Sequence, residues 1–328
     1  MAHSNQFIRV VVAAAILLLA AACSRLPSIS TGGDVTALYA PPETYADHRA
    51  QQQTFVVDGL SLAYTDHGEG PAIVLLHGVP TSSWMYRKVI PGLQTNFRVI
   101  SVDLIGFGSS DKPEGEAAYG EALQAERVRL LLGELGVDQY ALLLHDMGGL
   151  VAWEIMRTAP EDVTHALILN TIVGDVGFNQ PNMKPGAMTR QLMNAYSSGL
   201  TSSAVLTKTF NDLGLTGEHK LTEEECFGYV LPMREGANPA LYSFFTSINE
   251  QMFESLDEQW TALKTWNGEA FVMWGAEDET LTTNQIPMLK ETLSIPEENI
   301  AIYWDNGHFL AEEIPDEIVR NAEAFIRG

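Results

Sequence analysis

The chain has little cysteine. Only Cys23 and Cys226 occur among 328 residues, so a small domain held together by a disulfide framework is excluded. Cys23 lies at the end of an N-terminal apolar leader, which leaves Cys226 without a partner in a mature chain. We therefore expect no disulfide, and we expect Cys226 to be a buried structural thiol.

Positive charge is also scarce. Lysine and arginine together number 19 against 42 acidic residues, and the formal net charge is -23. The acidic residues are spread along the chain rather than gathered in a tail. This balance disfavours nucleic acid and anionic membrane surfaces as partners, so we expect a small neutral or apolar ligand.

No apolar run near the N-terminus is long enough to span a bilayer. Residues 10–22 are continuously apolar, which fits the core of a signal peptide over residues 1–22. The following "LLLAAACS" resembles a bacterial lipobox, which implies lipidation of Cys23 and anchoring in the cell envelope. An ordinary cleaved signal peptide is the alternative. Residues 23–53 are polar, proline-bearing and without periodicity, and we interpret them as a lipidated N-terminus and flexible tether.

Beyond residue 53, short buried runs bounded by glycine or proline alternate with amphipathic helical stretches. This alternation predicts an α/β fold with a mostly parallel sheet and helices on both faces. It stops after Asn170 and returns at "EAFVMWG". We therefore predict a core from residues 54–172 and 263–328, interrupted by an inserted helical cap over residues 173–262.

The stretch "LLLHDMGGLVAW" (142–153) has no serine where a buried strand bends into a helix, and Asp146 stands at the tip. Three further polar clusters follow predicted strands, namely "HGVP" (77–80), "WGAEDETL" (274–281) and "DNGHF" (305–309). Because ligands of parallel sheets collect at the carboxyl ends of strands, we expect the four clusters to meet.

These clusters, in this order, resemble the α/β-hydrolase fold, and specifically its aspartate-nucleophile branch of epoxide hydrolases and haloalkane dehalogenases. The resemblance covers residues 55–328. It implies Asp146 as nucleophile, His308 as general base and Asp278 as the acid that orients it, with Glu277 as a less favoured neighbour. Asn170, at another strand end, cannot hold the charge of a histidine. The resemblance also implies an oxyanion hole formed by two backbone N–H groups, those of Val79 and Met147.

A carboxylate nucleophile suits displacement at a saturated carbon, which leaves an ester that His308 and water then hydrolyse. Such a reaction needs no cofactor and no metal, and the histidines and cysteines show no metal-ligand spacing. An inert binding protein of the cell envelope is the non-enzymatic alternative. We expect three further residues to line the pocket: His77, Trp84 and Phe309.

The leaving group decides between an epoxide and a haloalkane as substrate. Dehalogenases of this family place side-chain N–H donors where this chain has Met147 and Val79, which cannot donate. Epoxide hydrolases use cap tyrosines, and Tyr196 and Tyr242 stand in matching regions, with Tyr229 in reserve. The stretches "HGVPTSSWMYRKVIP" and "DLIGFGSSDKP" nevertheless look more like a dehalogenase. We therefore favour an epoxide hydrolase and keep a haloalkane dehalogenase with atypical halide donors as the alternative.

Overall fold

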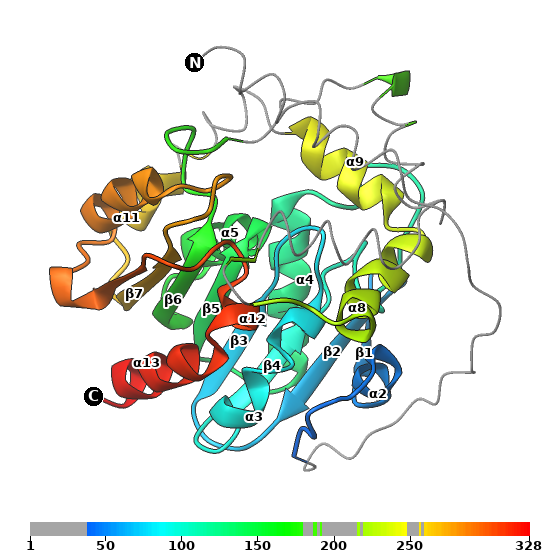
Figure 1. Ribbon diagram of the computed structural model, residues 1–328, viewed down its shortest axis with the longest axis horizontal. Coiled ribbons are helices and arrows are strands. Elements are labelled where there is room, and N and C mark those ends of the chain that lie inside the picture. Colours follow the sequence, from blue (N-terminus) through cyan, green and yellow to red (C-terminus); the bar gives the residue numbers. More distant parts are fainter. Residues whose placement is uncertain are drawn as a thin grey trace.

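The computed structural model describes residues 38–179, 186–188, 191, 215–216, 219–247, 256 and 259–328. Its centre is an eight-stranded sheet with the order β1-β2-β4-β3-β5-β6-β7-β8 (Figure 1). The first two pairings are antiparallel and all others are parallel, which confirms the predicted mostly parallel sheet. The strands are β1 (Gln53–Val57), β2 (Leu60–His67), β3 (Ala72–Leu76), β4 (Arg98–Val102), β5 (Tyr140–Asp146), β6 (Val163–Thr171), β7 (Glu269–Gly275) and β8 (Ile300–Tyr303).

Helices cover both faces of the sheet, so the central strands are apolar on both sides. Every residue of β3 and β5 is buried. On one face, α4 (Glu121–Glu134), α5 (Met147–Thr158) and α11 (Ile286–Thr292) enclose one apolar core. On the other, α3 (Ile90–Leu93) and α13 (Pro315–Arg327) pack against a second core. The remaining short elements are η1 (Ser83–Tyr86), η2 (Thr283–Gln285), η3 (Glu297–Asn299) and α12 (Leu310–Glu313).

Parallel register brings the carboxyl ends of the central strands to one edge. Leu76 of β3 lies opposite Val102 of β4 and Leu144 of β5. The loops that follow these strands therefore start side by side, and this edge is where the polar clusters predicted from the sequence meet.

The segment before β1 corrects the predicted tether. Residues 45–50 form helix α2 (Tyr45–Ala50), which begins with a capping box between Thr44 and Asp47. Tyr45 and His48 are buried, and the His48 Nε2 lies 2.8 Å from the Ser83 Oγ of η1. The tether prediction is therefore wrong for residues 38–53. A run with no hydrophobic period can still be held when a few aromatic side chains dock into an existing core.

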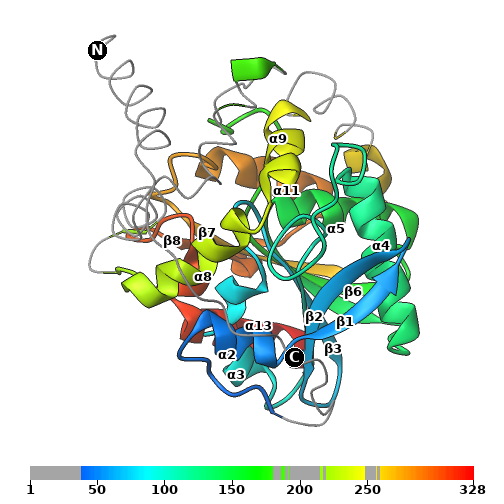
Figure 2. The ribbon, with the colours of Figure 1, turned by 90° about the vertical axis from the view of Figure 1, so that its right-hand side faces the viewer.

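Between β6 and β7, the described residues include helices α8 (Glu223–Arg234) and α9 (Asn238–Ser247), which lie beyond one end of the sheet (Figure 2). A capping box between Thr222 and Glu225 starts α8. The helix packs so closely on Trp84 that a Cβ at Gly228 would lie 2.4 Å from the indole ring. Cys226 is fully buried in the second apolar core, as expected of a structural thiol.

The predicted signal peptide, Cys23 and the first part of the tether lie outside the described residues. Among the residues that are described, no helix has both the length and the apolar character needed to cross a membrane.

Candidate active site

Asp146 stands at a sharp bend between β5 and α5, with φ 50° and ψ -122°. This conformation is strained for a residue with a side chain, and such strain collects at functional sites. The bend also requires the two glycines that follow. A Cβ at Gly148 would lie 2.3 Å from the Leu76 carbonyl oxygen, and one at Gly149 would lie 1.9 Å from the Thr171 hydroxyl.

Two backbone N–H groups, those of Val79 and Met147, hold the Asp146 carboxylate. The Val79 N–H donates to Asp146 Oδ1 at 2.8 Å, and the Met147 N–H also donates to this carboxylate. Gly78 is needed beside it, because a Cβ there would lie 2.3 Å from the Asp146 Cβ. The side chain is therefore buried with one oxygen already fixed by a main-chain donor.

The structure brings His308 and Asp278 to the same place. His308 Nδ1 lies 2.7 Å from Asp278 Oδ2, and His308 Nε2 lies 3.9 Å from Asp146 Oδ2. Asp278 is fixed in turn by the backbone N–H of Leu281 and by the Asn170 amide, which donates to Oδ2 at 2.9 Å. Asn170, rejected as the acid from the sequence, thus orients the acid instead.

The charges around His308 set the protonation of the site. Burial raises the pKa of Asp146 and outweighs the opposing effects of His308 and the two N–H donors. Burial also disfavours charge on His308, but the neighbouring carboxylate of Asp278 and its hydrogen bond prevail and raise the pKa of His308. For Asp278, burial opposes ionisation, yet the interaction with His308 lowers its pKa. An ionised Asp278 next to an imidazole of raised pKa is the arrangement expected of a general base and its orienting acid.

Two buried histidines support this arrangement without reaching the substrate side. Burial lowers the pKa of His145 well below its usual value, so its ring is neutral, and its Nε2 lies 2.9 Å from the His308 carbonyl oxygen. His77 accepts the Leu104 N–H at Nε2, and its Nδ1 lies 2.8 Å from the Gly78 oxygen. His77 therefore shapes the loop that carries Val79, which corrects its predicted place in the pocket wall.

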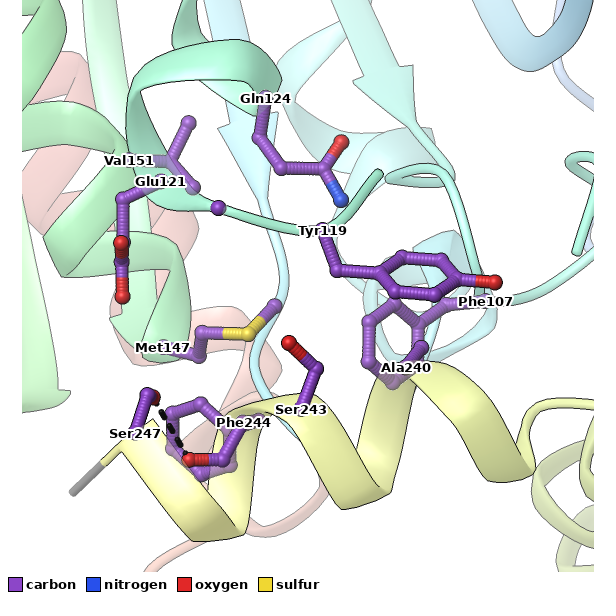
Figure 3. A pocket seen from close by; sticks show the side chains of 11 residues that line it. Phe107, Tyr119, Glu121, Gln124, Met147, Val151, Ala240, Ser243, Phe244 and Ser247 are labelled. Carbon is purple, nitrogen blue, oxygen red and sulfur yellow. Dashed lines mark hydrogen bonds between the residues drawn. The ribbon is translucent and has the colours of Figure 1, made fainter. Parts of the chain in front are cut away.

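A cavity opens beside Met147, whose side chain forms part of its wall (Figure 3). Its lining is apolar on most sides, with a few polar groups, and α9 contributes four of the residues. Trp84 and Phe309, predicted as pocket residues, do not line it. Trp84 is fully buried beneath α8, and Phe309 packs edge-to-face on His308 with ring centroids 4.9 Å apart. The lining comprises Phe107, Tyr119, Gly120, Glu121, Gln124, Met147, Val151, Ala240, Ser243, Phe244 and Ser247.

Several of these cavity residues were not predicted from the sequence. Phe107 follows β4 within the "DLIGFGSSDKP" stretch, which the sequence singled out only as a family likeness. Tyr119 lies just before α4 and Gln124 lies in its first turn. Only their position beside a bend 22 or more residues further along the chain gives them this role, and the sequence carries no local signal of it.

The predicted tyrosines do not all meet expectation. On α9, Ala240, Ser243, Phe244 and Ser247 face the cavity, and Tyr242 lies on the opposite side of the helix by its position in the turn. The Tyr242 hydroxyl accepts the Gly186 N–H at 2.9 Å, so the placement of Tyr242 argues against its predicted role as a proton donor in this cavity. Tyr196 lies outside the described residues. Tyr229, the reserve candidate, donates its hydroxyl to Glu312.

A second group of charged residues joins α8 to the core. Arg87, Tyr229 and Glu312 are buried, Glu225 is partly buried and Lys88 is exposed, and we refer to the five as the cap ion-pair cluster. Arg87 pairs with Glu312 of α12 and with Glu225 of α8, the latter at 2.9 Å. Lys88 bridges the same two carboxylates at 2.9 and 2.7 Å. The cluster fixes α8 onto the element that follows His308.

Among the residues that the structure describes, no three His, Cys, Asp or Glu side chains gather in a way that could hold a metal ion.

Comparison with known proteins shows the family to which this chain belongs. Residues 71–315 match the family described as the alpha/beta hydrolase fold. A 117-residue segment is 37% identical to a bifunctional epoxide hydrolase of Rattus norvegicus. This segment covers 35% of this chain but only 21% of the length of that enzyme. Another relative, a cis-3-alkyl-4-alkyloxetan-2-one decarboxylase of Shewanella oneidensis, is 24% identical over 284 residues, or 82% of this chain and 86% of the relative.

Solved structures agree on the fold. The haloalkane dehalogenase DpaA from Paraglaciecola agarilytica matches 84% of this chain and 93% of its own, with a TM-score of 0.66 and 23% identity. Epoxide hydrolases and haloalkane dehalogenases are thus among the relatives, as the sequence motifs predicted.

Proposed function

Because the chain belongs to the α/β-hydrolase fold family, we propose that it is a hydrolase that works through a covalent ester on Asp146. One observation carries this proposal. The Asp146 carboxylate stands at the strained bend with Oδ1 on the Val79 N–H and Oδ2 facing His308 Nε2 at 3.9 Å. A small apolar substrate in the adjacent cavity would present a saturated carbon to that second oxygen.

In the first step, Asp146 Oδ2 attacks the carbon and the bond to the leaving group breaks with its electron pair. This step consumes the negative charge of Asp146, and an alkyl ester of Asp146 remains. The loss of that charge removes one of the influences that raise the pKa of His308. The imidazole is therefore more readily neutral at the stage where it must accept a proton.

In the second step, His308 takes a proton from water and the resulting hydroxide attacks the Asp146 Cγ. The negative charge moves to Oδ1, where the Val79 and Met147 N–H groups receive it. Each such donor is worth roughly 3 to 4 kcal/mol in related oxyanion holes. Asp278 stabilises the imidazolium until the ester bond breaks, when the imidazolium returns its proton to the departing alkoxide. The product leaves as an alcohol, and the Asp146 carboxylate returns when the second water proton is released.

An epoxide is the substrate class that we favour. Met147 borders the cavity with a thioether, and neither it nor Val79 can donate a side-chain hydrogen bond to a halide. An epoxide oxygen instead needs one proton as it leaves, and we assign that donor to Tyr196. Dehalogenation with a halide donor elsewhere in the cap is the alternative, and an inert binding protein is the non-enzymatic one.

The nearly full-length decarboxylase relative supports a second candidate substrate, an oxetan-2-one. Its strained ring also offers a saturated carbon to Asp146, and its leaving group is a carboxylate that needs no proton. The position of Tyr242, with its hydroxyl on Gly186, is consistent with chemistry that uses no tyrosine donor. The freed carboxylate then leaves as carbon dioxide, and the electron pair of its carbon–carbon bond forms an alkene as the bond to Asp146 breaks. Alkene and carbon dioxide as products, in place of a diol, distinguish this candidate.

We also propose that Cys23 carries a lipid that anchors the enzyme in a bacterial envelope, with residues 24–37 linking it to α2. Metabolic labelling with a radioactive fatty acid tests this. Label should enter the wild-type chain and be lost in Cys23→Ala, and equal labelling of both would refute lipidation at this position.

Turnover of a styrene-type epoxide in heavy-oxygen water tests the ester route. Label should enter the Asp146 carboxylate over repeated turnovers, because each hydrolysis places a water oxygen on Cγ. In His308→Gln, the peptide containing Asp146 should gain the mass of the substrate, since the ester forms but is not hydrolysed. Product formation without label in Asp146 would instead indicate direct attack by water.

A further inference from the structure

The loop that carries His308 is held from the core side at two points. It runs from the end of β8 through Asp305 and Gly307 to the base. The Glu277 N–H donates to the Asn306 oxygen at 2.9 Å, and His145 Nε2 lies 2.9 Å from the His308 oxygen. These contacts come from residues next to Asp278 and Asp146, so the core fixes one side of the loop.

Glu313, at the end of α12, holds the other side. Its carboxylate is buried, and Oε2 accepts the Gly307 N–H at 2.7 Å, directly before His308. Its second oxygen, Oε1, accepts the backbone N–H of Thr216 at 2.6 Å. The Thr216 hydroxyl also donates to the Asp305 oxygen at 2.6 Å. Thr216 belongs to the segment between β6 and α8. It therefore ties this inserted segment to the loop of His308 directly at Asp305 and, through Glu313, at Gly307.

Only a carboxylate of this length can make the bridge. Two N–H donors approach its two different oxygens, whereas a glutamine would present one oxygen and one NH₂ group and leave one donor facing another donor. An aspartate would keep the charge, but it is one methylene too short to span both donors. The residue type is thus matched to the geometry.

We infer that Glu313 is a positioning residue that clasps the His308 loop to Thr216, so that the inserted segment helps to set the angle at which the base meets the Asp146 ester. The inference rests on the function proposed above. Because the clasp acts on the base and not on the nucleophile, it affects hydrolysis of the ester and leaves its formation unchanged.

The charges facing His308 make this role measurable. Asp278 and Asp146 face the ring with negative charge, and the neutral His145 ring lies with its centroid 4.4 Å from that of His308. Glu313 adds a further negative charge through space, which also raises the pKa of His308. The effect of the Glu313 charge on the His308 pKa can therefore be separated from the effect of its two hydrogen bonds by substituting Glu313.

The decisive experiment compares Glu313→Gln with Glu313→Asp in the full chain. Histidine side-chain NMR measures the His308 pKa in the resting protein, and rapid-quench mass spectrometry measures ester formation and hydrolysis separately. We expect Glu313→Gln to lower the His308 pKa and to slow ester hydrolysis about tenfold, with formation unchanged. Glu313→Asp should restore the pKa but not the rate of hydrolysis.

Thr216→Val is the milder variant if the buried substitutions impair folding. It removes the hydroxyl, which contacts the Asp305 oxygen and Glu313 Oε1, and leaves the Thr216 N–H bond to Glu313 in place. We expect it to slow ester hydrolysis about threefold. Thr95→Val is its matched control, since the Thr95 hydroxyl donates to the Gly92 oxygen on an exposed turn away from the site. Unchanged hydrolysis in Glu313→Gln and Thr216→Val would overturn the clasp. A wild-type enzyme that never forms the ester would refute the proposed function instead, and a displacement of the His308 ring signals in Glu313→Asp, where the charge is kept, would still report on the clasp.

Discussion

Two clusters of charged side chains lie within a few residues of each other, and their positive and negative charges are balanced differently. Around His308, two carboxylates, Asp146 and Asp278, face a single imidazole. In the cap ion-pair cluster, Arg87 and Lys88 pair with both Glu225 and Glu312. His308 and Glu312 are only four residues apart, so the same short stretch serves both clusters.

The balance decides what each cluster can do. Burial acts to raise the pKa of Glu225, yet the hydrogen bond from Lys88 and the nearby cations prevail and lower that pKa to about 2. For Asp146, burial outweighs the opposing charge of His308 and the N–H donors, and the pKa of Asp146 is raised. A fully paired carboxylate is inert and holds elements together, whereas an incompletely compensated one is reactive. The difference assigns structure to one cluster and chemistry to the other.

Removing the reactive carboxylate should have the largest effect. Asparagine tolerates the positive φ at position 146, so Asp146→Asn should keep the fold and lower turnover on the order of 10⁴-fold or more, because no ester can form. Turnover assays with thermal unfolding as the folding control measure this. Mass spectrometry of the variant excludes slow deamidation back to aspartate, and near-normal turnover would refute nucleophilic attack by residue 146.

Breaking the paired cluster should act on stability. Glu312→Gln leaves Arg87 buried with one partner fewer, which we expect to lower the free energy of unfolding by about 3 to 5 kcal/mol. Denaturant unfolding measures it. Glu317→Gln is the matched control, since Glu317 pairs with Arg320 on the exposed surface, and it should cost less than about 1 kcal/mol. Equal losses in the two variants would contradict the structural role of the cluster.

The charge imbalance at His308 should appear in the pH dependence. The raised pKa of His308 means that the neutral base is lost as the pH falls through a value above 6.5, and the hydrolysis rate should then fall about tenfold per pH unit. Asp278→Asn removes the main stabiliser of the imidazolium and should move this acid limb to lower pH, besides slowing turnover. Hydrolysis rates measured between pH 5 and 9 test both statements. An acid limb that stays in place in the variant would argue against Asp278 as the cause.

Tyr242 should matter least. Tyr242→Phe removes the acceptor of the Gly186 N–H and should cost about 1 kcal/mol of stability, with less than about a twofold change in turnover. Tyr196→Phe is the matched comparison, and if Tyr196 is the proton donor, it alone should suppress diol formation. A collapse of turnover in Tyr242→Phe would restore Tyr242 as a donor and contradict its placement on α9.

The alternation of apolar runs predicted the parallel sheet, and the polar clusters at strand ends predicted the meeting of Asp146, His308 and Asp278. Both patterns are local, since strand period and glycine turns are written in neighbouring residues. His77 and Trp84 were misplaced because a short motif does not reveal whether a side chain faces a cavity or a packed element. The docking of α2 was missed for the same reason, because Tyr45 and His48 gain their burial from η1 and not from their own segment.

By itself, the sequence determined the fold class and the residue types at the bend, because backbone strain and strand burial restrict which residues can stand there. Only the tertiary structure decided which carboxylates keep excess charge, that Tyr242 turns away from the cavity, and that Glu313 ties the base loop to Thr216. These outcomes depend on distances between segments far apart in the chain, and burial and charge act through those distances rather than through the order of residues.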